Sequence, residues 1–136
     1  LKMEIGCAFP FQEERFMDIK GRNLLTGLPI TVTVSSNDLL DALSEPINEI
    51  LEAIHEVLEK TPPELSSDIS NVGIYLTGGG AMLNGLDKLI EQKTGIPTRL
   101  ADNPVECVAI GTGKSLDSLA ILEKSMKDSE RSKFSR

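Results

Sequence analysis

The segment spanning residues 72–86 constrains the fold more than any other part of the sequence. It holds an apolar run at 72–77, then the three glycines 78–80, then the start of a helical pattern. An apolar run with little alternation is typical of a β-strand that is covered on both faces. Glycines between a strand and a helix allow positive φ and close approach of a ligand, and ligands of open α/β sheets collect at such turns. From these residues alone, a ligand-binding turn and a tight turn without a ligand both remain open.

The rest of the chain alternates between strand and helix patterns. Ser35 and Asp38 have the spacing of a helix N-cap, Pro46 should kink or restart the helix that follows, and the Thr-Pro-Pro run should end it. The order of elements predicts an α/β fold in which helices pack on a layered sheet. The expected elements are a β-hairpin from 14–21 and 28–35, a helix over about 38–60, the strand 72–77, a helix at about 83–93, a strand at 96–101 and a helix at about 104–122.

Charge and composition exclude several functions. The net charge is −7, and residues 1–122 carry 9 basic against 18 acidic side chains, which gives −9. Such an acidic body repels nucleic-acid phosphates, so we expect no DNA or RNA partner. No apolar run approaches the roughly 20 residues that span a bilayer, and no signal peptide is recognisable, so we expect a soluble chain that is not exported. With Cys7 and Cys107 far apart and His55 the single histidine, we expect reduced packing cysteines and no metal site.

Two known phosphate-binding loops do not fit the sequence. A dinucleotide-binding GxGxxG motif that starts at Gly78 needs a glycine where Leu83 stands. The string Gly113-Lys114-Ser115 resembles the end of a P-loop, but that motif needs a glycine at Val108. Neither loop explains the glycine turn.

Five strings over residues 1–122 resemble, in the same order, the MreB-type bacterial actins, including their Mbl-like paralogues. Each string alone is only suggestive, and their common order makes the assignment specific. The strings are IGCAFP at 5–10, GRNLLTGLP at 21–29, EKTPPEL at 59–65, LTGGGA at 76–81 and TGIP at 94–97.

The resemblance implies the second lobe of an actin-like ATPase. Residues 1–36 would be part of its small, hairpin-containing subdomain, and residues 37–122 the later part of its large subdomain, which has a ribonuclease-H-like sheet. Residues 123–136 match nothing in the family, and we expect a disordered tail there. The resemblance assigns these site residues: Gly78, Gly79, Gly80 and Ala81 beside the adenosine and α-phosphate of ATP, Met82 and Leu83 near the adenine, and Lys2 on the opposite wall.

The implied parent is an ATP-dependent, filament-forming protein that maintains rod shape by organising cell-wall synthesis. It would be cytoplasmic and membrane-associated as a filament, with further copies of itself and membrane-bound cell-shape proteins as partners. Its membrane contact, phosphate-gripping loops and magnesium-holding acid belong to an earlier lobe. We therefore expect Mg²⁺ only in the parent, and no catalytic residue or catalysis in this chain alone.

Two other functions remain open. The chain could be a stand-alone, truncated product that acts as a non-catalytic binding module and docks a partner through its acidic helix 38–60. It could also be a relative of sugar or acetate kinases, although no substrate-binding segment is visible. The spacing of residues 1–6 suits the last turn of a helix closed by Gly6, which favours a longer parent.

Overall fold

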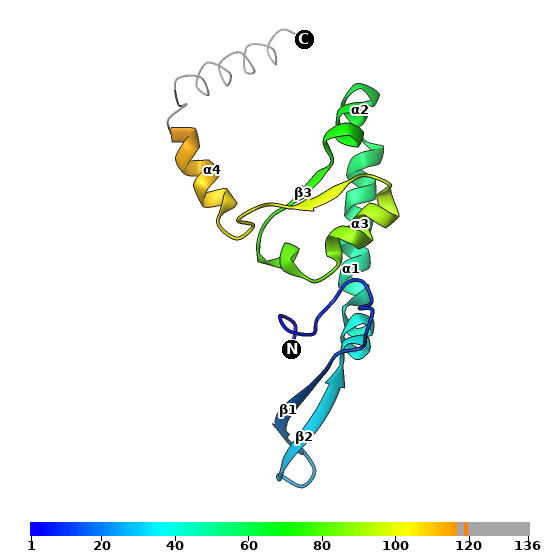
Figure 1. Ribbon diagram of the computed structural model, residues 1–136, viewed down its shortest axis with the longest axis vertical. Helices are drawn as coiled ribbons and strands as arrows, with labels where there is room; N and C mark the ends of the chain where they lie inside the picture. Colours follow the sequence, from blue (N-terminus) through cyan, green and yellow to red (C-terminus); the bar gives the residue numbers. More distant parts are fainter. Residues whose placement is uncertain (117–118, 120–136) are drawn as a thin grey trace.

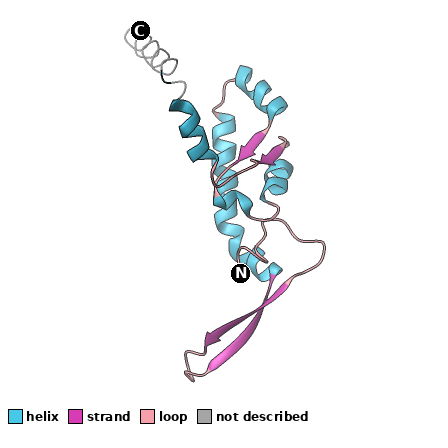
Figure 2. Cartoon of the chain, turned by 60° about the vertical axis from the view of Figure 1, so that its left-hand side comes forward, coloured by secondary structure: helices cyan, strands magenta, loops and turns pink. Residues whose placement is uncertain are grey.

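The computed structural model describes residues 1–116 and 119, and it arranges them along one long helix, α1 (Figure 1). A β-hairpin projects from one end of α1, and a strand–helix–strand unit packs beside its other half (Figure 2). In order, the elements are β1 Phe16–Arg22, β2 Pro29–Ser35, α1 Ser36–Glu59, α2 Pro63–Val72, β3 Ile74–Leu76, the short 3₁₀ helix η1 Gly79–Met82, α3 Leu86–Thr94, β4 Thr98–Leu100 and α4 Cys107–Leu116.

Helix α1 begins with the reciprocal cap that the sequence predicts. The Asp38 N–H donates to the Ser35 hydroxyl at 3.2 Å, and the Ser35 N–H donates to the Asp38 carboxylate at 2.9 Å. Hydrogen bonding of Ser35 to the Asp38 carboxylate, first from its backbone N–H and then from its side chain, holds the pKa of Asp38 below its usual value. The helix then runs through Pro46 to Glu59, so of the two outcomes expected at this proline, a kink or a restart, the restart is wrong. The proline is exposed and removes one backbone donor, and the packing of the residues that follow it outweighs this loss.

The core lies where α1 packs against α3. Ile47 and Leu51 of α1 and Leu86 and Ile90 of α3 are buried together with Ala8 from the N-terminal segment. The predicted apolar face of α1 is only partly buried, because the side chains of Ile50 and Val57 are 46% and 66% exposed. Residues packed around this core are Leu43, Ile54, Ile74, Leu76, Leu83 and Leu89.

Strands β3 and β4 form a parallel pair that is connected through η1 and α3. The pair is shorter than predicted, since Val72 ends α2 and Gly73, with φ of 91°, separates that helix from β3. Ile74 and Leu76 pack toward the core, but Tyr75 is 55% exposed. Within the described residues, β3 is covered on one face only, so the expectation of a strand covered on both faces is wrong there. Helix α2 was not predicted.

The hairpin agrees with the sequence prediction to within two residues. Antiparallel pairing runs from Phe16 opposite Ser35 to Arg22 opposite Pro29. In the connecting loop, the Asn23 side chain accepts from the N–H groups of Leu25 and Thr26, as turn-forming asparagines do.

The N-terminal segment is fastened to the start of α3. Residues 2–5 form a turn, in which the Ile5 and Gly6 N–H groups share the Leu1 carbonyl, in accord with the predicted helical spacing. Farther along, Cys7 bridges to Asn84, the Ala8 N–H donates to the Asn84 carbonyl at 2.8 Å, and the Asn84 side chain donates to the Gly6 carbonyl at 3.0 Å. These bonds join residues almost eighty positions apart.

The C-terminal helix α4 buries none of its residues and stands apart from the core in Figure 1. The helix expected at about 104–122 is thus confirmed from Cys107 to Leu116. The rest of that expectation, apart from residue 119, and the expected tail 123–136 lie outside the described residues. None of the helices in the described part of the chain is long and apolar enough to cross a membrane.

The contact between Gly85 and Phe9 makes a stability prediction. Gly85 and Gly95 flank α3 with nearly equal φ of 76° and 71°, but a Cβ on Gly85 would lie 2.6 Å from the Phe9 Cβ, whereas one on Gly95 meets nothing within 4 Å. We expect Gly95→Ala to cost about 1–2 kcal/mol of unfolding free energy from its positive φ alone, and Gly85→Ala clearly more. Thermal unfolding of the full-length protein measures the difference, and equal shifts for the two variants would contradict this packing.

The two free cysteines should differ in reactivity. Cys7 is fully buried, and this burial raises the pKa of its thiol against the opposing charge of Arg15, while Cys107 is half-buried. Because the thiolate is the reactive species, we expect iodoacetamide to alkylate Cys7 at least about tenfold more slowly than Cys107. Peptide mass spectrometry of the native protein reads both sites at once, and equal rates would show that the N-terminal segment is not packed as described.

Candidate functional site

The glycine turn begins where β3 ends, and Gly78 sets its direction. Gly78 has φ of 86°, a conformation that other residues rarely adopt, and its N–H donates to the Pro104 carbonyl in the loop after β4. The turn is therefore tied to the carboxyl end of the neighbouring parallel strand. Gly79 and the three residues after it then form η1.

Gly79 and Gly80 are not explained by the packing of the described chain. Neither has positive φ, and a Cβ built on either would meet nothing within 4 Å. Among the described residues, no backbone carbonyl accepts from their N–H groups. Two unpaired donors on a backbone without side chains form a surface against which a ligand can lie closely.

These glycines form one side of a cleft of about 400 Å³. Five of the seven predicted site residues line it, including Lys2, which comes from the N-terminal turn more than seventy positions away. Its lining residues are Lys2, Met3, Gly79, Gly80, Met82, Leu83 and Val105.

The other two predicted residues lie beside the cleft. Ala81 lines a second, more apolar hollow of about 340 Å³ between the turn and α1, which shares Lys2, Gly80 and Leu83 with the cleft. Gly78 lines neither hollow and acts on the site through the direction of the turn.

The cleft pairs a positive charge with an apolar lining. Among the described residues, Lys2 is the one charged side chain that lines the cleft and no carboxylate does so, in a chain whose net charge is −7. Met3, Met82, Leu83 and Val105 supply apolar surface, of which Met3 and Met82 are 92% and 54% exposed. A ligand that joins an anionic group to a flat apolar ring matches this lining. Within the described residues, no group of histidine, cysteine, aspartate and glutamate side chains gathers as metal ligands would.

Met3 and Val105 are lining residues that the sequence reasoning missed. Val105 follows β4, and the carboxyl ends of adjacent parallel strands meet at one edge of a sheet. Pairing the two predicted strands in parallel would have placed the loop after residue 101 beside the glycine turn. Met3 carried no comparable signal.

The sequence model described as "MreB/Mbl protein" matches residues 1–124. The chain is 45% identical over 124 residues to the cell shape-determining protein Mbl of Bacillus subtilis, covering 91% of this chain and 37% of that protein. It is 49% identical over 119 residues to the cell shape-determining protein MreB of Escherichia coli, covering 88% of this chain and 34% of that protein. The chain thus spans about a third of the length of the curated relatives that it matches.

The fold is also similar to solved structures of MreB5 from Spiroplasma citri. The structure bound to ADP superposes with a TM-score of 0.82 at 35% identity, covering 87% of this chain and 36% of that one. The structure bound to AMPPNP superposes with a TM-score of 0.81 at 33% identity, covering 91% of this chain and 37% of that one. The expected actin-like α/β fold is confirmed by these matches.

Proposed function

The chain belongs to the MreB/Mbl family, and from this premise we propose that it is part of an ATP-dependent, filament-forming bacterial actin. This protein maintains rod shape by organising cell-wall synthesis, and the chain supplies the adenosine-binding turn of its nucleotide site. The names of the curated relatives support a role in cell shape, and the nucleotides bound in the two MreB5 structures support nucleotide binding.

The cleft at the glycine turn carries the proposal. In it, the N–H groups of Gly79 and Gly80, which donate to no carbonyl of the described residues, face a phosphate or ribose oxygen, and the Lys2 ammonium adds a positive charge from the other wall. Met82 and Leu83, with Val105 beside them, form the apolar surface for the adenine ring. The N–H donors and the positive charge suit the phosphates of an adenine nucleotide, and the apolar surface suits its adenine ring.

The remaining parts of the proposal concern the whole protein. Residues 1–36 belong to a small subdomain and residues 37–122 to a large one, a division that the projecting hairpin supports (Figure 1). The protein is cytoplasmic and membrane-associated as a filament, and other copies and membrane-bound cell-shape proteins are its partners. The ATPase chemistry, with its Mg²⁺, needs phosphate-gripping and magnesium-holding groups from another lobe, because phosphoryl transfer depends on such positioned charges.

Blocking the glycine surface should weaken nucleotide binding without unfolding the protein. The Gly79 Cβ position is open, so Gly79→Val fills the ligand's space and not the protein's own. We expect the affinity of the full-length protein for a fluorescent ATP analogue to fall by at least about tenfold, a loss of about 1.4 kcal/mol of binding free energy.

Gly21→Val is the matched control for this experiment. Gly21 lies in β1, far from the cleft lining, and its Cβ position is also open. The control variant should bind the analogue as the natural protein does. Unchanged affinity in the Gly79 variant would remove the glycine turn from the nucleotide site.

A further inference from the structure

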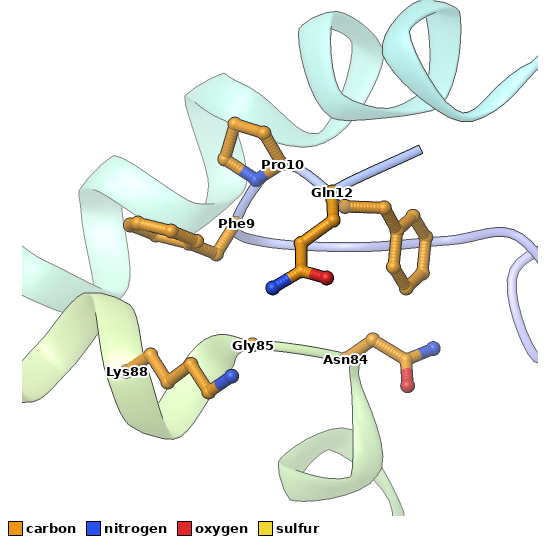
Figure 3. Close-up of a pocket in the computed structure, with 7 residues that line it drawn as sticks. Phe9, Pro10, Gln12, Asn84, Gly85 and Lys88 are labelled. Carbon is orange, nitrogen blue, oxygen red and sulfur yellow. The ribbon is translucent and has the colours of Figure 1, made fainter. Parts of the chain in front are cut away.

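A third hollow, a pocket of about 430 Å³, shares no residue with the glycine-turn cleft. It lies between the loop at residues 9–12 and the start of α3, and Figure 3 shows these two walls facing one another. The Gln12 amide points from the loop toward the α3 wall, and the Lys88 side chain extends from that wall (Figure 3). The residues that line it include Phe9, Phe11, Gln12, Asn84, Gly85 and Lys88.

The two walls are held together by the protein itself. Gly85 lies so close to Phe9 that a Cβ added at Gly85 would stand 2.6 Å from the Phe9 Cβ. Beside this contact, Asn84 binds the backbone of Gly6 and Ala8, and the Arg15 N–H donates to the Ser36 hydroxyl at 3.1 Å. The pocket is thus preformed, and a ligand entering it pays little for ordering the walls.

The charge of the pocket is opposite to that of the chain. Lys88 lines it, and the Arg15 guanidinium lies 4.1 Å from the centroid of the Phe11 ring. No ion pair of either cation with a carboxylate of the described residues is present. Glu13, Glu14 and Asp87 are close in sequence, but none of these three lines the pocket. In a chain with net charge −7, a pocket lined by a lysine and by no carboxylate of the described residues favours an anionic ligand.

The remaining lining residues narrow the ligand class. The half-buried rings of Phe9 and Phe11 offer flat apolar surface, and aromatic side chains pack well against such rings. The side-chain amides of Gln12 and Asn84 can both donate and accept hydrogen bonds, as a peptide backbone requires.

We propose that this pocket binds an acidic peptide segment of a partner protein, in which a carboxylate stands next to an aromatic side chain. The carboxylate pairs with Lys88, the aromatic ring packs on Phe9 and Phe11, and Gln12 bonds the peptide backbone. The proposal does not depend on the nucleotide site, because the two sites have no residue in common.

Fluorescence anisotropy of the full-length protein with a labelled six-residue peptide of alternating glutamate and phenylalanine tests this site. We expect Lys88→Gln to weaken binding about tenfold, because a charge-assisted hydrogen bond is lost. Lys93→Gln is the matched control, since Lys93 lies in the last turn of the same helix and outside the pocket. It should change the affinity less than about twofold, the residual effect of a distant, solvent-screened charge.

Three results would overturn the proposal. They are equal binding of the matching glutamine–phenylalanine peptide, equal weakening by both lysine variants, and displacement of the peptide by 3-phenylpropionate at the same concentration as by unlabelled peptide. Equal binding of the glutamine–phenylalanine peptide would mean that apolar contact alone holds the peptide. Equal weakening by both lysine variants would mean that only the net charge of the protein matters, and displacement by 3-phenylpropionate would indicate a site for small acids. Both lysine variants should keep the nucleotide affinity of the natural protein, so failure here is distinguishable from failure of the nucleotide site.

Discussion

The apolar contact between α1 and α3 supports both sheets of the described structure. A two-stranded sheet is marginal by itself, and the two sheets that the described residues form, the hairpin and the β3–β4 pair, have two strands each. Each is stabilised by its attachment to this contact, since the hairpin leads directly into the capped start of α1 and β3 packs Ile74 and Leu76 on the core. Ile90, almost fully buried between these elements, is at the centre of the arrangement.

This core also positions both candidate sites, because α3 and the turn before it are common to their surroundings. Leu83 connects the glycine turn to the start of α3, and Leu86 packs the first turn of that helix against α1. The N-terminal segment is hydrogen-bonded to Asn84, and this contact brings Lys2 to the cleft and Phe9 to the pocket that Lys88 lines. One short stretch of chain therefore contributes to two hollows of different chemistry.

Local signals in the sequence were sufficient for the elements that depend on neighbouring residues. The Ser35–Asp38 cap, the hairpin and the glycine turn follow from capping, alternation and turn chemistry. The site residues came instead from the resemblance to the family, and five of them line one cleft. Features set by distant contacts were not predictable in this way. The periodicity of α1 does not show which apolar residues another helix will cover, so the exposure of Ile50 and Val57 was missed. Helix α2 has a weak apolar face with no buried residue, and its Pro62-Pro63 start was interpreted only as the end of α1.

In the proposed nucleotide site, the glycine turn and Lys2 lie on opposite walls of one cleft. Photolabelling of the full-length protein with 2-azido-ATP tests it most directly, because the azide on the adenine ring reacts with the residues it touches and peptide mass spectrometry locates them. We expect labelling at Met3, Met82, Leu83 or Val105 that unlabelled ATP competes away. Specific labelling confined to other segments, including the pocket of Phe9 and Lys88, would contradict it.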